Sequence, residues 1–214
     1  MEDFVSGIGY YLSAPEKIIF AVATALLYPV LFIEVGALLY AAYECGSVTR
    51  EMYVRRRARK SLNIETTAAE MAVARAANDD AKMTAALDRF DFGPVVGPAA
   101  RKLSAHGTTR VRALKVLADA EQAAIRRLDK TRVLIRIGPM LGLMGTLIPI
   151  SPALVGLAQG DTQTLSTNLV TAFSTTVVGL LIGALAYIVS LIRERAYAQD
   201  LADLEYVLEH SGAK

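Results

Sequence analysis

The chain has 214 residues, of which 53% are hydrophobic, and its formal net charge is only +2 at pH 7. This composition is too apolar for an ordinary soluble domain, and the apolar residues gather in long runs between charged stretches. The single cysteine, Cys45, excludes an intrachain disulfide and a cysteine-based zinc cluster. His106 and His210 lie far apart in polar surroundings, so we expect solvated histidines, no metal site and no cofactor. The sequence therefore predicts an all-α integral membrane protein.

Residues 1–17 are predicted to form an outward-facing N-terminal segment. They begin Met-Glu-Asp-Phe, which is acidic where a secretory signal would be basic, so we expect no cleavable signal peptide.

The first membrane helix is predicted at residues 18–45, because a bilayer core about 30 Å thick needs about 20 apolar residues of helix. This run contains Pro29 and one carboxylate, Glu34, with Glu44 at its edge. A carboxylate in mid-span is costly and is usually paired or functional. Glu34 is thus a possible functional membrane carboxylate with a role in ion access. The alternatives are a neutral, hydrogen-bonded acid at a helix contact, or a residue nearer the interface.

Residues 46–133 are predicted to form a mostly helical segment outside the membrane. Residues 64–90 are rich in good helix formers and end at Asp-Phe-Gly-Pro, residues 91–94. From about residue 99 to 132, apolar residues recur at helical spacings, and we expect this helix to run without a break into the second span. The segment shows no phosphate-binding glycine loop, metal-ligand spacing or nucleophile–base pair. We therefore expect no enzymatic activity and expect its charges to lie on solvated faces.

Two further membrane helices are predicted at residues 134–158 and 164–192, joined by a short outer turn at 159–163. The second span is interrupted by three prolines, whose freed carbonyls need other partners. These prolines are Pro139, Pro149 and Pro152.

Residues 193–214 are predicted to form an amphipathic helix that extends the third span. Its apolar stripe is Tyr197, Leu201, Leu204 and Leu208, with Asp200 and other acids off the stripe. We expect the extensions of the second and third spans to pack on each other.

The lysines and arginines next to the spans indicate the orientation. They flank the segments 46–133 and 193–214, which we therefore place in the cytoplasm. The N-terminal segment offers only Lys17, beside Glu16, and the turn at 159–163 offers no basic residue. The basic residues are Arg50, Arg55, Arg56, Arg57, Arg59, Lys60, Arg126, Arg127, Lys130, Arg132, Arg136, Arg193 and Arg195.

Small and hydroxyl-bearing residues line the second and third spans. Gly142 and Gly145 in one, and Gly179 and Gly183 in the other, belong to small-residue faces, for which close helix packing is a sufficient explanation. The third span also carries a stripe of hydroxyls that includes Thr171 and Thr175. A lone threonine usually bonds its own backbone. A whole stripe is equally consistent with a polar, proton-accessible lumen.

Two segments resemble the MotA/TolQ/ExbB proton channel family. They are Ile-Gly-Pro-Met-Leu-Gly-Leu-Met-Gly-Thr-Leu at 137–147 and Ala-Phe-Ser-Thr-Thr-Val-Val-Gly at 172–179, and the resemblance extends over about residues 100–210. It implies a ring-shaped homo-oligomer, a pentamer, around two copies of a single-span partner of the ExbD/TolR/MotB type. The partner would supply the ion-carrying carboxylate. By position, Thr146 and Thr176 match the pore threonines that face this carboxylate, and Pro139 matches the proline at the entry to the second span.

The resemblance points to two branches of the family. Members of the ExbB and TolQ type commonly have a glutamate where this chain has Thr171, and the Ala-Phe-x-x-Thr-x-x-Gly pattern is closer to flagellar stators. The three-span layout with an outer N-terminus is nevertheless that of ExbB and TolQ. The expected function is a proton channel subunit of an energy-transducing motor complex in the plasma (inner) membrane, driving import, envelope work or motility. The alternative is a non-conducting membrane scaffold that assembles a complex.

Overall fold

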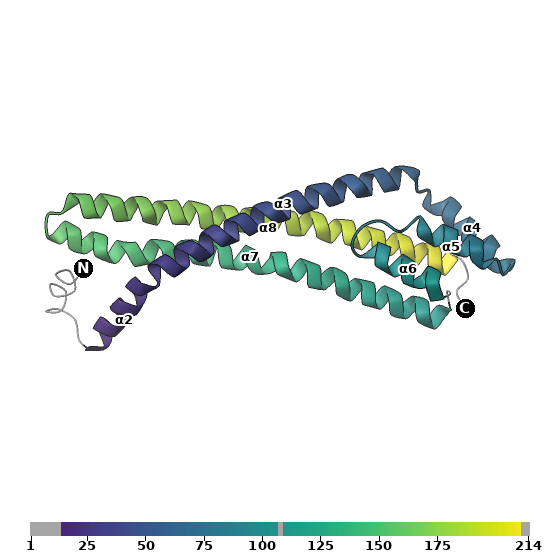
Figure 1. Ribbon diagram of the computed structural model, residues 1–214, viewed down its shortest axis with the longest axis horizontal. Coiled ribbons are helices and arrows are strands. Elements are labelled where there is room, and N and C mark those ends of the chain that lie inside the picture. Colours follow the sequence, from purple (N-terminus) through teal and green to yellow (C-terminus); the bar gives the residue numbers. More distant parts are fainter. Residues whose placement is uncertain (1–13, 107–108, 211–214) are drawn as a thin grey trace. The chain divides into compact units, whose positions relative to one another are not determined.

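The computed structural model describes residues 14–106 and 109–210, and all regular elements in these ranges are α-helices (Figure 1). Three helical stretches of the described chain are long and apolar enough to cross a membrane: Pro15–Lys60, Arg110–Ala158 and Thr162–His210. The all-helical, three-span prediction is thereby confirmed, and the chain is a multi-pass membrane protein. Most of the predicted outward-facing segment 1–17 lies outside the described residues.

The first span is divided into α2 (Ala14–Ala25) and α3 (Leu27–Ser61) at Leu26. Pro29 explains this break, because its ring has no N–H and clashes with the carbonyl one turn earlier, that of Ala25. Helical bonding resumes at once, since the N–H of Val30 donates to the carbonyl of Leu26 at 3.0 Å.

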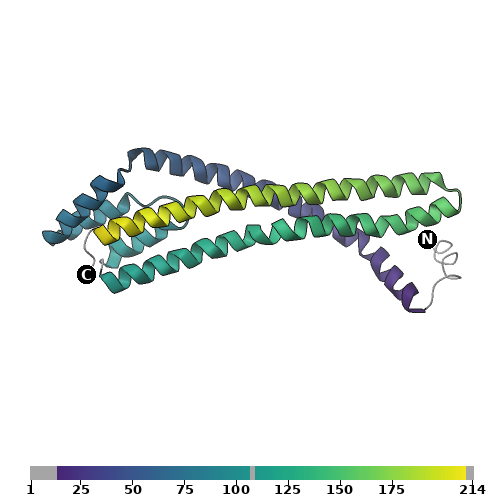
Figure 2. The same cartoon turned by 180° about the vertical axis from the view of Figure 1, so that it is seen from behind.

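The second and third spans form a hairpin of two long helices, α7 (Arg110–Ala158) and α8 (Thr162–His210). In both views, α7 and α8 lie side by side as they run from the turn that joins them (Figures 1 and 2). Gly160 supplies the turn's left-handed conformation, with φ of +76°. Asp161 caps α8, because its Oδ1 accepts hydrogen bonds from the N–H groups of Gln163 and Thr164 at 3.1 and 3.0 Å. The prolines of the second span lie inside α7 without ending it.

Contacts divide the chain into two compact units. The first, here called the membrane unit, holds the chain up to Ala42 together with Leu134–Leu185. The second, here called the basal unit, holds Tyr43–Val133 and the chain from Ala186 onward. Each unit is described separately below.

In the basal unit, the stretch 64–90, which is rich in helix formers, forms two helices, α4 (Ile64–Ala76) and α5 (Asp80–Asp88). Asn78 adopts a left-handed conformation with φ of +50°, which ends α4, and the Asp79 side chain caps α5 by accepting from the N–H of Lys82 at 3.1 Å. The helix expected from residue 99 into the second span is also interrupted. It consists of α6 (Val96–His106) and α7, and only from Arg110 onward does it run unbroken into the span.

The short helices pack against the extensions of α7 and α8 in this unit (Figure 1). The shared core is made of aromatic and aliphatic side chains, including Phe90, Leu103, Leu128, Tyr197 and Leu204. The predicted packing of the two extensions on each other is therefore observed. One residue differs from the amphipathic pattern, because Asp200 is only 1% exposed although it lies off the apolar stripe.

Candidate functional site

A seam of glycines holds α7 and α8 together in the membrane unit. A Cβ on Gly179 would lie 2.6 Å from the carbonyl oxygen of Gly138 and 2.7 Å from the Cα of Gly142. A Cβ on Gly183 would lie 3.1 Å from the Cδ of Pro139. Real Cβ atoms do not approach backbone as closely as a Cβ on Gly179 would, so the two helices meet there only because this position has no side chain, and the contact at Gly183 is tight. Pro139, Gly142, Gly179 and Gly183 are therefore packing residues of the hairpin.

Gly145 makes room for Thr175, whose Cβ would lie 2.6 Å from a Cβ at position 145. Thr175 is 5% exposed, and its hydroxyl donates to the carbonyl of Ala172 at 2.9 Å. The structure thus places Thr175 inside the hairpin rather than on its surface, and its hydroxyl is satisfied there.

Thr146 and Thr176 are half-buried and lie close together along the hairpin. A Cβ on Gly142 would lie 3.3 Å from the Cα of Thr176, and Thr146 follows Gly142 by four residues, one turn or about 6 Å along the same face of α7. Each hydroxyl donates to its own helix: Thr146 to the carbonyl of Leu143 at 2.7 Å, and Thr176 to that of Ala172 at 3.1 Å.

The rest of the hydroxyl stripe shows the same local bonding. Thr171, also half-buried, donates to the carbonyl of Thr167 at 3.1 Å. Ser174 and Thr167 likewise donate to carbonyls one turn earlier. A hydroxyl that donates to its backbone keeps its oxygen lone pairs as acceptors. The half-buried threonines can therefore accept a hydrogen bond from a protonated acid or from water, or coordinate a cation.

The two apolar stretches 137–158 and 162–192 contain no lysine, arginine, histidine, aspartate or glutamate. Within the membrane unit, however, Glu34 of α3 is only 3% exposed, and the backbone of Gly179 contacts its carboxyl. Its Oε1 has no hydrogen-bond partner among the described residues. The sequence singled out Glu34 but not its contact with α8, because only the packing of distant elements reveals it.

The basal unit contains buried ion pairs between α3 and α8. Arg193 binds Glu44 at 2.5 Å and the hydroxyl of Ser47 at 3.2 Å. Arg55 binds Asp200 at 2.8 Å and lies 4.9 Å from the ring centroid of Tyr197. The expectation that the charges of segment 46–133 lie on solvated faces is therefore wrong for Arg55, which is buried. Glu44, Arg193 and Asp200 are buried as well.

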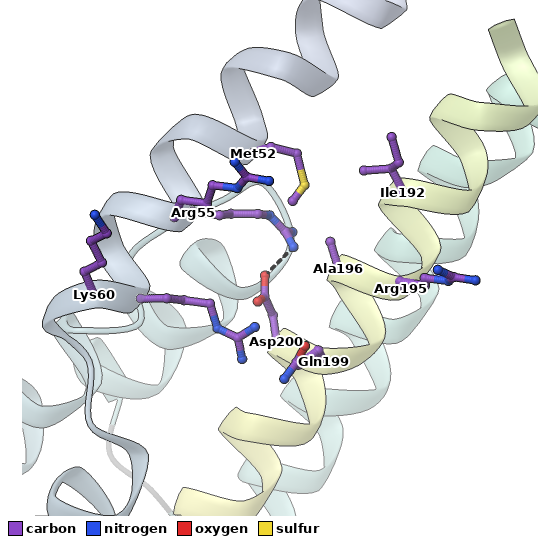
Figure 3. Close-up of a pocket in the computed structure, with 10 residues that line it drawn as sticks. Met52, Arg55, Lys60, Ile192, Arg195, Ala196, Gln199 and Asp200 are labelled. Atoms are coloured by element: carbon purple, nitrogen blue, oxygen red, sulfur yellow. Dashed lines mark ion pairs between the residues drawn. The ribbon is translucent and has the colours of Figure 1, made fainter.

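Next to the Arg55–Asp200 pair lies an open groove of about 610 Å³ between α3 and α8 (Figure 3). Figure 3 shows Arg55 pointing from α3 toward Asp200 of α8, with Lys60 on the α3 side. Five basic residues and one acid line the groove, so its excess charge is positive: Arg55, Arg56, Arg59, Lys60 and Arg195 against Asp200.

Comparison with known protein families matches part of the chain to a family model. The family model of the MotA/TolQ/ExbB proton channel family matches residues 98–205, which is just over half of the chain and includes all of α7 and α8 up to residue 205. No curated protein and no solved structure matches the chain.

Proposed function

Because the chain belongs to the MotA/TolQ/ExbB proton channel family, we propose that it is a proton-conducting subunit of an energy-transducing membrane motor. The observation that supports this most is the pair Thr146 and Thr176. Both are half-buried, lie within about one turn of each other along the seam, and keep hydroxyl lone pairs available in stretches of the hairpin that carry no charged side chain. Such oxygens stabilise a protonated group or a hydrated cation at membrane depth.

The mobile acid belongs to a partner in this proposal. The hairpin has no charged side chain between residues 137 and 158 or between 162 and 192, so a carboxylate that carries protons past Thr146 and Thr176 must come from another element. A single-span protein of the ExbD/TolR/MotB type supplies it. When protonated, its O–H donates to a threonine oxygen, and when ionised it requires water or a cation nearby.

A ring-shaped homo-oligomer surrounds the partner helices, with five copies as the family layout implies. The hairpin leaves large apolar side chains exposed, which suits contact with lipid and with neighbouring subunits. Examples are Leu143 at 59%, Leu147 at 60%, Phe173 at 67% and Val177 at 66%. The complex lies in the plasma (inner) membrane with its N-terminus outside, and drives import, envelope work or motility. The chain itself has no enzymatic role.

A second candidate function is a non-conducting scaffold. The glycine seam favours it, because Gly138, Gly142 and Gly179 are fully accounted for by packing within one chain. In that case the hydroxyls only satisfy their own backbones and no ion crosses the complex.

The test is proton flux into liposomes containing the chain co-purified with its single-span partner. Thr146→Val and Thr176→Val remove the hydroxyl at nearly constant volume, and we expect each to lower flux at least tenfold. Thr24→Val is the matched control, because Thr24 also donates to its own helix, at 2.9 Å to Phe20, but lies on α2. Normal flux in both hairpin variants would refute the residue assignment. An assembled wild-type complex that conducts nothing would favour the scaffold.

A further inference from the structure

Glu34 is the buried acid of the membrane unit, and the proposed pathway through Thr146 and Thr176 does not use it. It lies in the apolar part of α3 and is 3% exposed. No described residue gives its Oε1 a hydrogen bond, and Glu34 forms no ion pair with a basic group of the described chain. The hairpin segments 137–158 and 162–192 also hold no charge that could pair with it. An unpaired, ionised carboxylate is strongly disfavoured in such a place, so Glu34 holds a proton in this state.

The position of this acid connects it with the α7–α8 seam. Its carboxyl touches the backbone of Gly179, and Gly179 is the residue that packs on Gly138 and Gly142. Thr176 precedes Gly179 by three residues, which is less than one turn of α8.

A purely structural role explains these facts less well. A leucine or methionine would pack α3 against a glycine seam without burying a polar atom that lacks a partner. The unpartnered Oε1 therefore indicates that the acid is kept for its proton.

We propose that Glu34 is a proton-binding site of this chain, which exchanges its proton with the pathway at the Thr176–Gly179 turn of α8. The exchange with the pathway rests on the proposed function. The proton-binding site at Glu34 does not depend on that function. In one exchange, the O–H bond of Glu34 breaks and its proton passes to a water molecule or to the partner's carboxylate. A second proton then restores the acid, so the carboxyl is unchanged over a cycle.

The site predicts a characteristic chemical reactivity. A hydrophobic carbodiimide adds to protonated carboxyls in apolar surroundings, so wild-type complex in membranes should be labelled at Glu34. Glu44 and Glu51 are internal controls on the same helix, because both interact with Arg193 in the basal unit. Peptide mass mapping should show the adduct at residue 34 and not at 44 or 51.

Infrared spectroscopy then tests exchange without any need for flux. The wild type should show the C=O band of a protonated carboxyl, which shifts when H2O is replaced by D2O and is absent in Glu34→Gln. Absence of both adduct and band would overturn the proton-binding site. A band that never shifts in D2O would show a sealed structural acid and would overturn the proposal equally.

Flux separates this inference from the proposed function. We expect Glu34→Gln, which keeps size and polarity but cannot release a proton, to reduce flux at least tenfold, while Glu34→Asp retains most of it. Normal flux in Glu34→Gln would remove Glu34 from the pathway. If the wild type conducts nothing, the proposed function fails, and the adduct and the D2O shift still decide the proton-binding site.

Discussion

Among single residues, Asp200 has the most unusual electrostatic environment outside the membrane spans. It lies beyond the apolar part of α8, is 1% exposed and binds Arg55 at 2.8 Å. Burial raises the pKa of Asp200 to about 6, against the opposing effect of Arg55 and Arg59, with Asp203 and Glu51 adding to the rise. Arg59 in turn pairs with Asp203. Two effects on the Asp200 carboxyl thus oppose each other: desolvation favours its neutral form, and the two arginines favour its charged form.

The raised pKa predicts how stability changes with pH. Between pH 3.8, the ordinary pKa of this side chain, and about pH 6, Asp200 is mostly protonated in the folded chain and mostly ionised in the unfolded chain. The contribution of Asp200 is therefore fully present below pH 3.8, is lost as pH rises to 6, and is constant above. The loss amounts to about 3 kcal/mol, at about 1.4 kcal/mol per pKa unit. Thermal unfolding in detergent between pH 4 and 7 should show this slope in the wild type and a smaller one in Asp200→Asn. Equal slopes in the wild type and in Asp200→Asn would contradict the raised pKa of Asp200.

At the level of elements, the seam between α7 and α8 allows a matched pair of substitutions. Gly179→Ala places a Cβ 2.6 Å from a backbone oxygen of Gly138, whereas Gly36→Ala places one with nothing within 4 Å. We expect Gly179→Ala to separate the helices and to cost about 1–3 kcal/mol. Gly36→Ala should be neutral or stabilising, because alanine favours helix over glycine by about 1 kcal/mol.

The measurement for this pair is the melting temperature of each variant in one detergent, together with flux of the complex. A lower melting temperature for Gly179→Ala alone is the expected result. If both variants melt like the wild type, the close contact of α7 and α8 is not the determinant of hairpin stability.

The sequence predicted elements well where a single length or pattern determines them. Bilayer thickness fixes the length of a span, so the three apolar runs were sufficient to locate three long helices. The break within residues 64–90 was not predicted, because the turn depends on Asn78 and on capping by Asp79, a signal weaker than the surrounding helix formers. The glycines of the seam were recognised as packing residues, but Thr175 could not be told from Thr176 by spacing alone. Only the contact with Gly145 places Thr175 inside.

At the level of the whole molecule, the long helices belong to two environments. Helix α8 has 49 residues, or about 74 Å at 1.5 Å per residue, more than twice the thickness of a bilayer core. It contributes to the membrane unit up to Leu185 and to the basal unit from Ala186. The pairs Glu44–Arg193 and Arg55–Asp200 join residues about 145 positions apart in sequence. Hydropathy patterns carry no information on such pairings, and this is why the sequence predicted neither pair and placed Arg55 on a solvated face.

The distribution of basic residues gives a prediction for the whole molecule, its orientation. Arginines and lysines gather in the basal unit, where five of them line one groove, whereas the turn at 159–161 has none. The basal unit should therefore face the cytoplasm.

Cys45 is the only cysteine, so Cys45→Ser provides a cysteine-free background into which single reporter cysteines can be introduced. We expect a membrane-impermeant maleimide to label Gln159→Cys in right-side-out vesicles and Lys102→Cys in inside-out vesicles. Both native side chains are exposed, so accessibility does not favour either site. The reverse pattern would invert the orientation and with it the direction of the proton flow that we propose through Thr146 and Thr176.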